Sequence, residues 1–167
     1  MSKQRYFLLL FTLLLGVLPT SATATQPTST LGTGDQLAEI TLEDQHGQPH
    51  TVPPDARLLL FTADKGASNL LQDYLEQQES AFLQQREAYY VADIHRMPGL
   101  VTRMFALPSM RERPYTILLA QEATAIPPIP HQDGQVTVLH LDNRRIAHIG
   151  YATSLQELAQ LINRPQP

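Results

Sequence analysis

One segment constrains the fold of this chain more than any other: residues 57–75, which read RLLLFTADKGASNLLQDYL. The continuous apolar run at its start is typical of a central strand that is buried on both faces. A short polar loop follows, from Asp64 to Ser68. Apolar residues then recur with helical spacing at Leu70, Leu71, Tyr74 and Leu75. The segment therefore predicts a buried strand, a loop and an amphipathic helix.

The neighbouring segments extend this pattern into an alternating order. Residues 38–52 alternate between apolar and polar around a His-Gly turn, which predicts a hairpin. Residues 89–94 predict a second buried strand. Alternation of strand, helix and strand favours a parallel pair joined by a right-handed crossover.

The second half of the chain predicts a helix, a strand, a hairpin and a final helix. Pro98 fits the first turn of a helix that ends at Pro108, with one face formed by Leu100, Val101, Met104 and Phe105. A third strand is expected at 115–119, and a proline-rich linker at 121–135. The hairpin spans 136–151. A capping box of Ser154 and Glu157 starts the last helix.

The first residues predict export of the protein. Lys3 and Arg5 precede an apolar run at 6–18, and Ala22-Thr23-Ala24 is typical of a cleavage site. We expect a signal peptide at 1–24, cleaved after Ala24, and a periplasmic or secreted domain without a membrane span. A retained N-terminal anchor is the alternative. Residues 25–34 are expected to form a flexible tether, and 35–167 a single domain.

Charge and cysteine content exclude several classes of function. Removal of Lys3 and Arg5 would lower the formal charge of −4 by two units, to −6. Nucleic-acid binding needs a basic surface, so no nucleic-acid partner is expected. The chain contains no cysteine, so its stability comes without disulfides.

The order of the elements resembles the thioredoxin-like superfamily across 35–163. ITLEDQHGQPHTV resembles the N-terminal hairpin of exported thiol oxidoreductases and peroxiredoxins, and VADIHRMPGLVTRMFALP resembles the segment before their conserved proline. The resemblance implies an α/β fold in which helices flank a mixed central sheet, with an N-terminal β-hairpin. It also places Pro114 where the family has its cis-proline.

The chain departs from this family at its chemistry. The redox pair of the family should lie near Lys65 and Ser68, and neither is cysteine. Disulfide exchange requires a thiolate, which a serine hydroxyl cannot replace. Disulfide oxidoreductase and thiol peroxidase activity are therefore excluded.

Three functional hypotheses remain open from the sequence. The first is a non-redox module that binds a protein or peptide through one face. The candidate residues are Asp64, Lys65, Gly66, Ser68, Arg113, Pro114 and Tyr115. The backbone beside a cis-proline can pair with an extended peptide without sulfur. The plainer interpretation is that Asp64 or Ser68 caps the helix and that Pro114 shapes a turn.

The second hypothesis is a sulfur-independent enzyme or a small-anion site at the helix N-terminus, near Lys65 and Ser68. The third is a metal-handling protein that uses some of the six histidines. No nucleophile elbow, P-loop or zinc motif occurs in the sequence. We therefore assign no catalytic residue, no metal ligand and no cofactor, and the oligomeric state stays open.

Overall fold

The structure is a computed structural model and describes residues 30–165. The expected signal peptide and residues 25–29 of the expected tether lie outside this range. Within it, no helix has the length and apolar character needed to cross a membrane.

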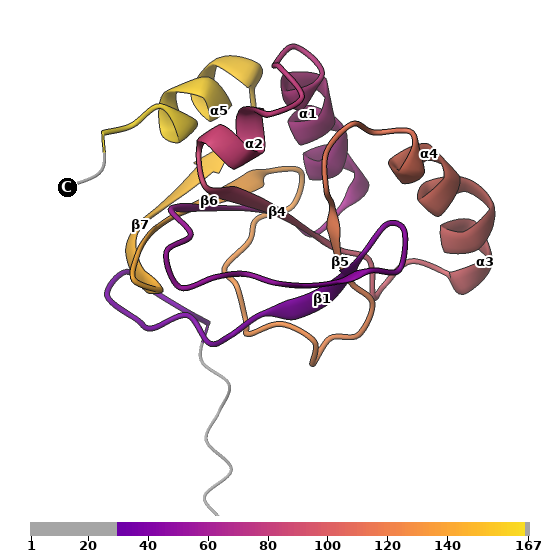
Figure 1. Ribbon diagram of the computed structural model, residues 1–167, viewed down its shortest axis with the longest axis horizontal. Coiled ribbons are helices and arrows are strands. Elements are labelled where there is room, and N and C mark those ends of the chain that lie inside the picture. Colours follow the sequence, from indigo (N-terminus) through magenta and orange to yellow (C-terminus); the bar gives the residue numbers. More distant parts are fainter. Residues whose placement is uncertain (1–29, 166–167) are drawn as a thin grey trace, which may run out of the picture.

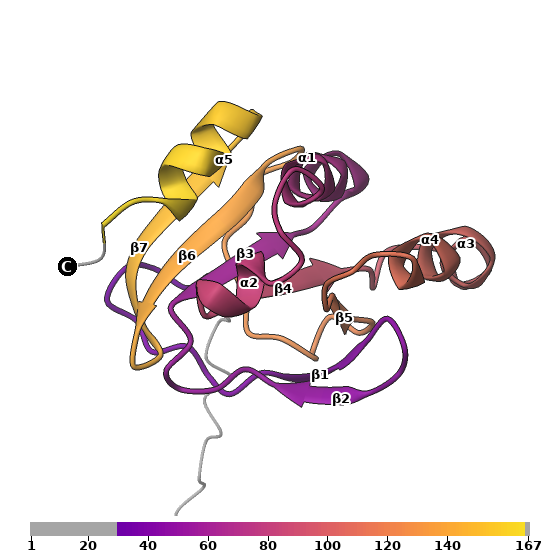
Figure 2. The same ribbon diagram turned by 45° about the horizontal axis from the view of Figure 1, so that its top comes forward.

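The domain is built on one mixed sheet of seven strands, with the spatial order β2-β1-β5-β4-β3-β6-β7 (Figures 1 and 2). The strands are β1 (Thr41–Asp44), β2 (Pro49–Thr51), β3 (Leu58–Thr62), β4 (Ala88–Asp93), β5 (Leu118–Ala120), β6 (Val136–Asp142) and β7 (Arg145–Ala152). Strands β3, β4 and β5 are mutually parallel, and the other pairs are antiparallel. The expected mixed sheet and N-terminal hairpin are both confirmed.

Strand β3 lies near the centre of the sheet because its side chains are apolar on both faces. Every residue of β3 is buried. Leu58 and Leu60 join the core on one face, and Leu59 and Phe61 join the core on the other. A strand exposes alternate side chains to opposite faces, so a continuous apolar run fits only where both faces are covered.

The helices cover one face of the sheet. They are α1 (Lys65–Leu75), α2 (Phe82–Gln85), α3 (Gly99–Val101), the π-helix η1 (Thr102–Ala106), α4 (Leu107–Arg111) and α5 (Leu155–Ile162). Figure 2 shows α1 and α5 on the same side of the sheet. Buried side chains of α1, α2, α4 and α5 share one core. The opposite core is closed by coil that contributes Leu37, Ile40 and Ile129.

Two predicted boundaries differ from the structure. Pro108 lies inside α4, because the preceding π-turn lets the N–H of Leu107 bond the carbonyl of Thr102 and puts the proline in the first turn of a new helix. The third strand covers only Leu118–Ala120 rather than 115–119, for a reason found at the functional site.

Residues 31–36, which include part of the expected tether, lie against the domain. The N–H of Leu31 donates to the carbonyl of Pro128 at 3.0 Å, and that of Gly34 to Ile146 at 2.8 Å. Gln36 forms an isolated bridge with Arg145. The described part of the tether is thus hydrogen-bonded to the fold.

Candidate functional site

The structure separates the two groups of candidate residues. The loop 63–68 follows β3 and lies at the carboxyl end of the three parallel strands. Residues 113–117 precede β5 and therefore lie at the opposite, amino end of the sheet. Because β6 runs antiparallel to β3, Gly134 before β6 is the neighbour of the loop. The expectation of one face formed by 64–68 and Pro114 is therefore corrected.

At the carboxyl end, Asp64 closes the N-terminus of α1. Its carboxylate accepts hydrogen bonds from the N–H of Ala67 at 2.9 Å and of Gly134 at 2.7 Å. Burial raises the pKa of Asp64, but these backbone donors outweigh it and hold the pKa below its ordinary value. The helix N-terminus thus already holds a negative charge from its own chain, as the plainer interpretation predicted.

The other loop candidates have structural surroundings. The hydroxyl of Ser68 donates to Thr62 Oγ1 at 3.0 Å. A Cβ on Gly66 would lie 3.1 Å from the Asp64 carboxylate and 3.4 Å from Gly134 Cα, so the loops meet closely there. Lys65 is exposed. A tightly closed helix end with a carboxylate in it leaves little room for an anion.

The amino end of the sheet holds an open pocket of about 610 Å³, which we call the amino-end pocket. Its walls include the candidates Arg113, Pro114 and Tyr115, together with Gln45, His46 and His50 from the β1–β2 hairpin. The volume is in the range of sites that take a small molecule or a side chain of a partner. The structure thus brings three of the seven predicted site residues to a pocket.

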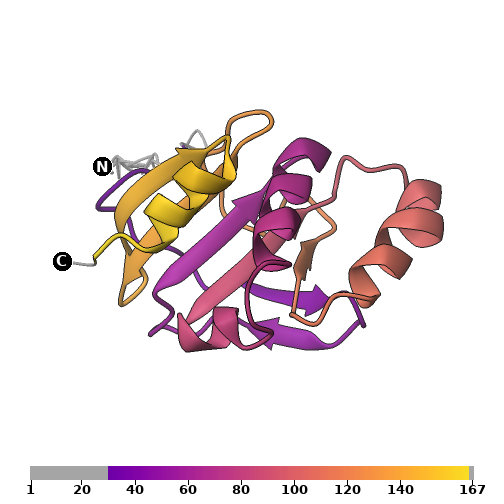
Figure 3. The ribbon, with the colours of Figure 1, turned by 90° about the horizontal axis from the view of Figure 1, so that it is seen from above.

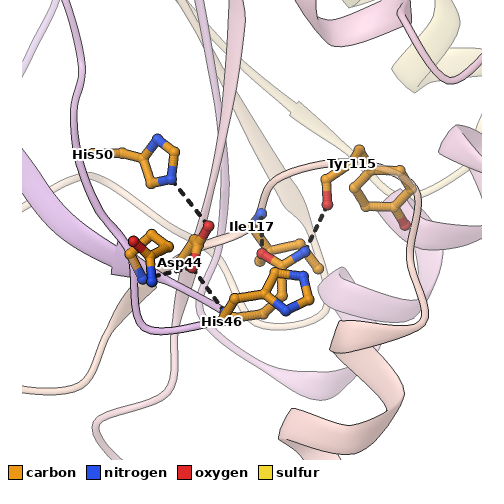
Figure 4. Close-up of polar contacts among 7 residues, drawn as sticks. Asp44, His46, His50, Tyr115 and Ile117 are labelled. Atoms are coloured by element: carbon orange, nitrogen blue, oxygen red, sulfur yellow. Dashed lines mark hydrogen bonds and ion pairs between the residues drawn. The ribbon is translucent and has the colours of Figure 1, made fainter.

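Gln45 fixes the wall formed by residues 115–117. Its side-chain amide donates to the carbonyl of Tyr115 at 2.8 Å and accepts from the N–H of Ile117 at 2.8 Å (Figure 4). Arg111 Nε donates to the carbonyl of Gln45 at 2.8 Å. A side chain therefore takes the hydrogen bonds that a neighbouring strand would make, which explains why β5 begins only at Leu118. The same bonds oppose pairing of a peptide strand beside Pro114.

Asp44 anchors the β1–β2 hairpin, which carries the two histidines of the pocket. Its carboxylate accepts from the N–H groups of His46 at 2.8 Å and Gln48 at 2.9 Å, and from His50 Nε2 at 3.0 Å. Burial raises the pKa of Asp44, but these donors outweigh it and keep the pKa below its usual value. The pair of Asp44 and His50 gives one wall of the pocket a polar, oriented imidazole (Figure 4).

Tyr115 and Arg113 form the opposite wall. Burial raises the pKa of Tyr115 to about 12, and its hydroxyl has no hydrogen-bond partner among the described residues. Arg113 pairs with Glu76 and donates to Gln72 Oε1 at 3.2 Å. All peptide bonds in residues 30–165 are trans, so Pro114 is not the cis-proline that the resemblance implies.

Within residues 30–165, no three His, Asp or Glu side chains converge on one point. His140 and His148 are direct cross-strand partners, because a bulge after His140 supplies the extra residue that aligns them. Their rings lie 5.6 Å apart. His140 Nε2 is bound to the carbonyl of Leu161 at 2.9 Å, and His148 Nε2 accepts from Arg164 at 2.6 Å. The histidine hypothesis gains no support from this pair.

The sequence does not single out Gln45, Asp44 or His50 as site residues. They lie in a hairpin of ordinary composition, and the partners of Gln45 are 70 and 72 residues away along the chain. Hydrophobic periodicity carries no signal for such long-range side-chain to backbone bonds. Only the hairpin turn itself could have been predicted.

No family model and no curated protein sequence matches the chain. Among solved structures, the Chlorobium tepidum protein assigned as the thiol:disulfide interchange protein DsbE aligns with a TM-score of 0.53 and 14% identity, over 80% of this chain and 96% of that chain. A Bacteroides thetaiotaomicron protein assigned as a protein disulfide isomerase gives 0.50 and 11%, over 80% and 92%. Peroxidoxin BcpB of Mycobacterium tuberculosis gives 0.49 and 16%, over 78% and 93%.

Identities at this level concern the fold alone. The fold of the Chlorobium tepidum and Bacteroides thetaiotaomicron proteins agrees with the mixed sheet and flanking helices described above. The expected resemblance is thereby confirmed: this chain has a thioredoxin-like fold, shared with thiol-disulfide proteins, and carries no cysteine.

Proposed function

We propose that the chain is a non-redox thioredoxin-like module of the cell envelope that binds a protein or peptide partner in the amino-end pocket. The observation that carries this proposal is the pocket of about 610 Å³ between the β1–β2 turn and residues 113–116. The envelope location rests on the predicted signal peptide. The loop 64–68 takes no part, because the Asp64 carboxylate and Gly134 close it.

The partner is expected to insert a side chain rather than add a strand. The carbonyl of Tyr115 and the N–H of Ile117 are both engaged by Gln45, so neither is free for a peptide backbone. The pocket offers two imidazoles, a buried tyrosine and the Arg113 stem, a mixture that suits an amphipathic side chain.

Photocrosslinking in the native envelope tests the proposal. A photoreactive residue at Thr116, which is exposed and lines the pocket, should give a discrete adduct with the partner. The same residue at Lys65, at the other end of the sheet, should give none. The two positions are matched because both are exposed and neither side chain makes a hydrogen bond to the rest of residues 30–165.

A pair of tryptophan variants then assigns the adduct to the pocket. Ser80→Trp places a large side chain at the pocket wall, and Gln85→Trp places it on the same segment outside the wall. We expect the Thr116 adduct to be lost in Ser80→Trp and kept in Gln85→Trp. An adduct at Lys65, or one at Thr116 that survives Ser80→Trp, would contradict binding in the pocket.

A further inference from the structure

An exposed apolar surface lies on α3 and η1, neither of which contributes a residue to the lining of the amino-end pocket. It consists of Leu100, Val101, Met104 and Phe105, which are 70%, 42%, 59% and 67% exposed, and we call it the apolar patch. These residues follow the helical spacing noted in the sequence, but the face they form points outward. Neither α3 nor η1 contributes a buried residue to the core.

This exposure is unusual because the four side chains are contiguous. Single exposed apolar residues are ordinary in soluble proteins, whereas a group on one helical face marks an interaction surface. Among the described residues, the other large exposed apolar side chain is Leu155, which stands apart on α5 at 37%. The patch also contains the π-helix η1, a distortion that is common at functional sites.

The charged side chains within the segment that carries the patch are all positive. Between residues 94 and 111 there are three arginines, Arg96, Arg103 and Arg111, and no Asp or Glu, although acidic residues exceed basic ones in the chain as a whole. Arg96 and Arg103 are exposed and make no ion pair with any residue of 30–165. The flanking acids are Asp93, whose carboxylate is bound to His95, and Glu112.

The segment stands at the rim of the molecule. In Figure 3, α5, α1 and the α3–α4 segment lie side by side over the sheet, with α3 and α4 at the side away from α5. Figures 1 and 2 show the same segment as the outermost part of that side. An exposed helical segment with an apolar face and neighbouring arginines resembles an interfacial helix, which lies on a bilayer and does not span it.

We propose that the apolar patch docks on a membrane surface that contains anionic phospholipid, with Arg96 and Arg103 against the head groups. Charge complementarity favours this occupant: residues 94–111 carry arginines and no Asp or Glu in a chain with an acidic net charge, and juxtamembrane arginines are attracted to anionic lipid. A second copy of the chain would bring the same arginines to the contact and no Asp or Glu from residues 94–111 to pair with them, so the charges of the two copies would repel.

The absence of cysteine provides a local test on the full-length chain. Met104→Cys introduces a single thiol in the patch, and Leu155→Cys introduces one at the matched exposed position on α5. Each thiol is labelled with an environment-sensitive fluorophore. The label reports only its own surroundings, so binding by another part of the chain does not shift it.

We expect the Met104 label to shift to the blue with vesicles of phosphatidylglycerol and phosphatidylcholine, but not with phosphatidylcholine alone. The Leu155 label should stay unchanged. Arg103→Gln in the labelled chain should raise the lipid concentration for half of the shift about 5-fold, and Arg96→Gln with Arg103→Gln about 25-fold. Lys65→Gln, a matched loss of one exposed charge elsewhere, should leave it unchanged.

Three outcomes would overturn the proposal. The first is a Met104 label that does not respond although the chain sediments with the anionic vesicles. The second is an equal response to neutral and anionic vesicles. The third is a blue shift that grows with protein concentration in the absence of lipid, which would assign the patch to a second copy of the chain.

Discussion

The two ends of the central sheet have opposite characters. At the carboxyl end, Asp64 and Gly134 draw two loops together and close the N-terminus of α1. At the amino end, Gln45 and Asp44 use the same kind of side-chain to backbone bond, but they hold a pocket open. The comparison teaches that side-chain to backbone hydrogen bonds can close one end of a sheet and support an accessible pocket at the other end.

Loss of the Gln45 side chain should have the largest effect on stability, because it removes the hydrogen bonds that hold residues 115–117 at the amino end. Gln45→Ala leaves the buried carbonyl of Tyr115 and the buried N–H of Ile117 without partners. We expect the free energy of unfolding to fall by about 2–4 kcal/mol in urea denaturation.

Gln48→Ala is the matched control, since this glutamine lies in the same turn and its side chain is exposed. Its unfolding free energy should stay within about 0.5 kcal/mol of the parent value. Equal unfolding free energies of Gln45→Ala and Gln48→Ala would show that the hydrogen bonds of Gln45 to Tyr115 and Ile117 do not stabilise the amino end.

Removal of the Asp64 carboxylate should open the carboxyl end at a smaller cost. Asp64→Ala removes the cap of α1 and the bond to Gly134, which together should cost about 2 kcal/mol in the free energy of unfolding. Asp73→Ala, on the exposed side of the same helix, should be neutral or slightly stabilising in the same denaturation series. If Asp73→Ala lowers the free energy of unfolding as much as Asp64→Ala does, the Asp64 carboxylate has no special role in stabilising α1.

Substitution of Gly134, which donates to the Asp64 carboxylate, should have a somewhat smaller effect on stability. Gly134 has φ +73°, a left-handed conformation in which a side chain is strained. Gly134→Ala should lower the free energy of unfolding by about 1 kcal/mol. Gly99→Ala is the control: a Cβ there meets nothing within 4 Å and lies at the start of α3. If thermal unfolding ranks the two variants equally, the backbone of Gly134 does not help to close the carboxyl end.

Low pH should have the smallest of these effects on the free energy of unfolding, through Asp44 at the amino end of the sheet and Asp64 at the carboxyl end. Burial raises the pKa of Asp44 and Asp64, but their donors outweigh it and hold both below the ordinary 3.8. The folded chain therefore binds fewer protons than the unfolded chain, and its stability from these groups is complete above about pH 4 and declines as the pH falls through the folded-state values.

Urea denaturation between about pH 2 and pH 6 measures this slope. Asp64→Asn should flatten it, because the amide does not titrate in this range. An unchanged slope in Asp64→Asn would show that Asp64 does not contribute to the pH dependence of the free energy of unfolding.

The sequence predicted well what depends on local pattern. The apolar run at 58–62 became β3, the run at 89–94 became β4 at Ala88–Asp93, and Ser154 caps α5 as expected. In each case one segment contains both the signal and its cause: burial on two faces, or a hydroxyl beside free N–H groups.

What failed depends on partners that are distant along the chain. Pro114 was expected beside the loop 64–68 because the order of elements suggested it. However, residues 113–117 precede a strand parallel to β3, and the residue that faces the loop is Gly134. The late start of β5 has a similar cause, since Gln45 takes its hydrogen bonds from the preceding hairpin. The outward face of α3 and η1 could not be predicted either, because helical periodicity shows that a face exists and not what covers it.

The position of β1 in the sheet has a consequence for how the chain folds. Its neighbours are β2, a few residues away, and β5, where Glu43 pairs with Leu119 and Asp44 with Leu118. The hairpin is made early during synthesis but lacks its second neighbour until the middle of the domain exists. Gln36 can form its bridge only after Arg145, which lies still later in the chain, has been synthesised. Contacts between residues so distant along the chain close late, so β1, the first strand of residues 30–165, is expected to be among the last to complete its pairing, and folding is expected to finish only after the C-terminal hairpin has formed.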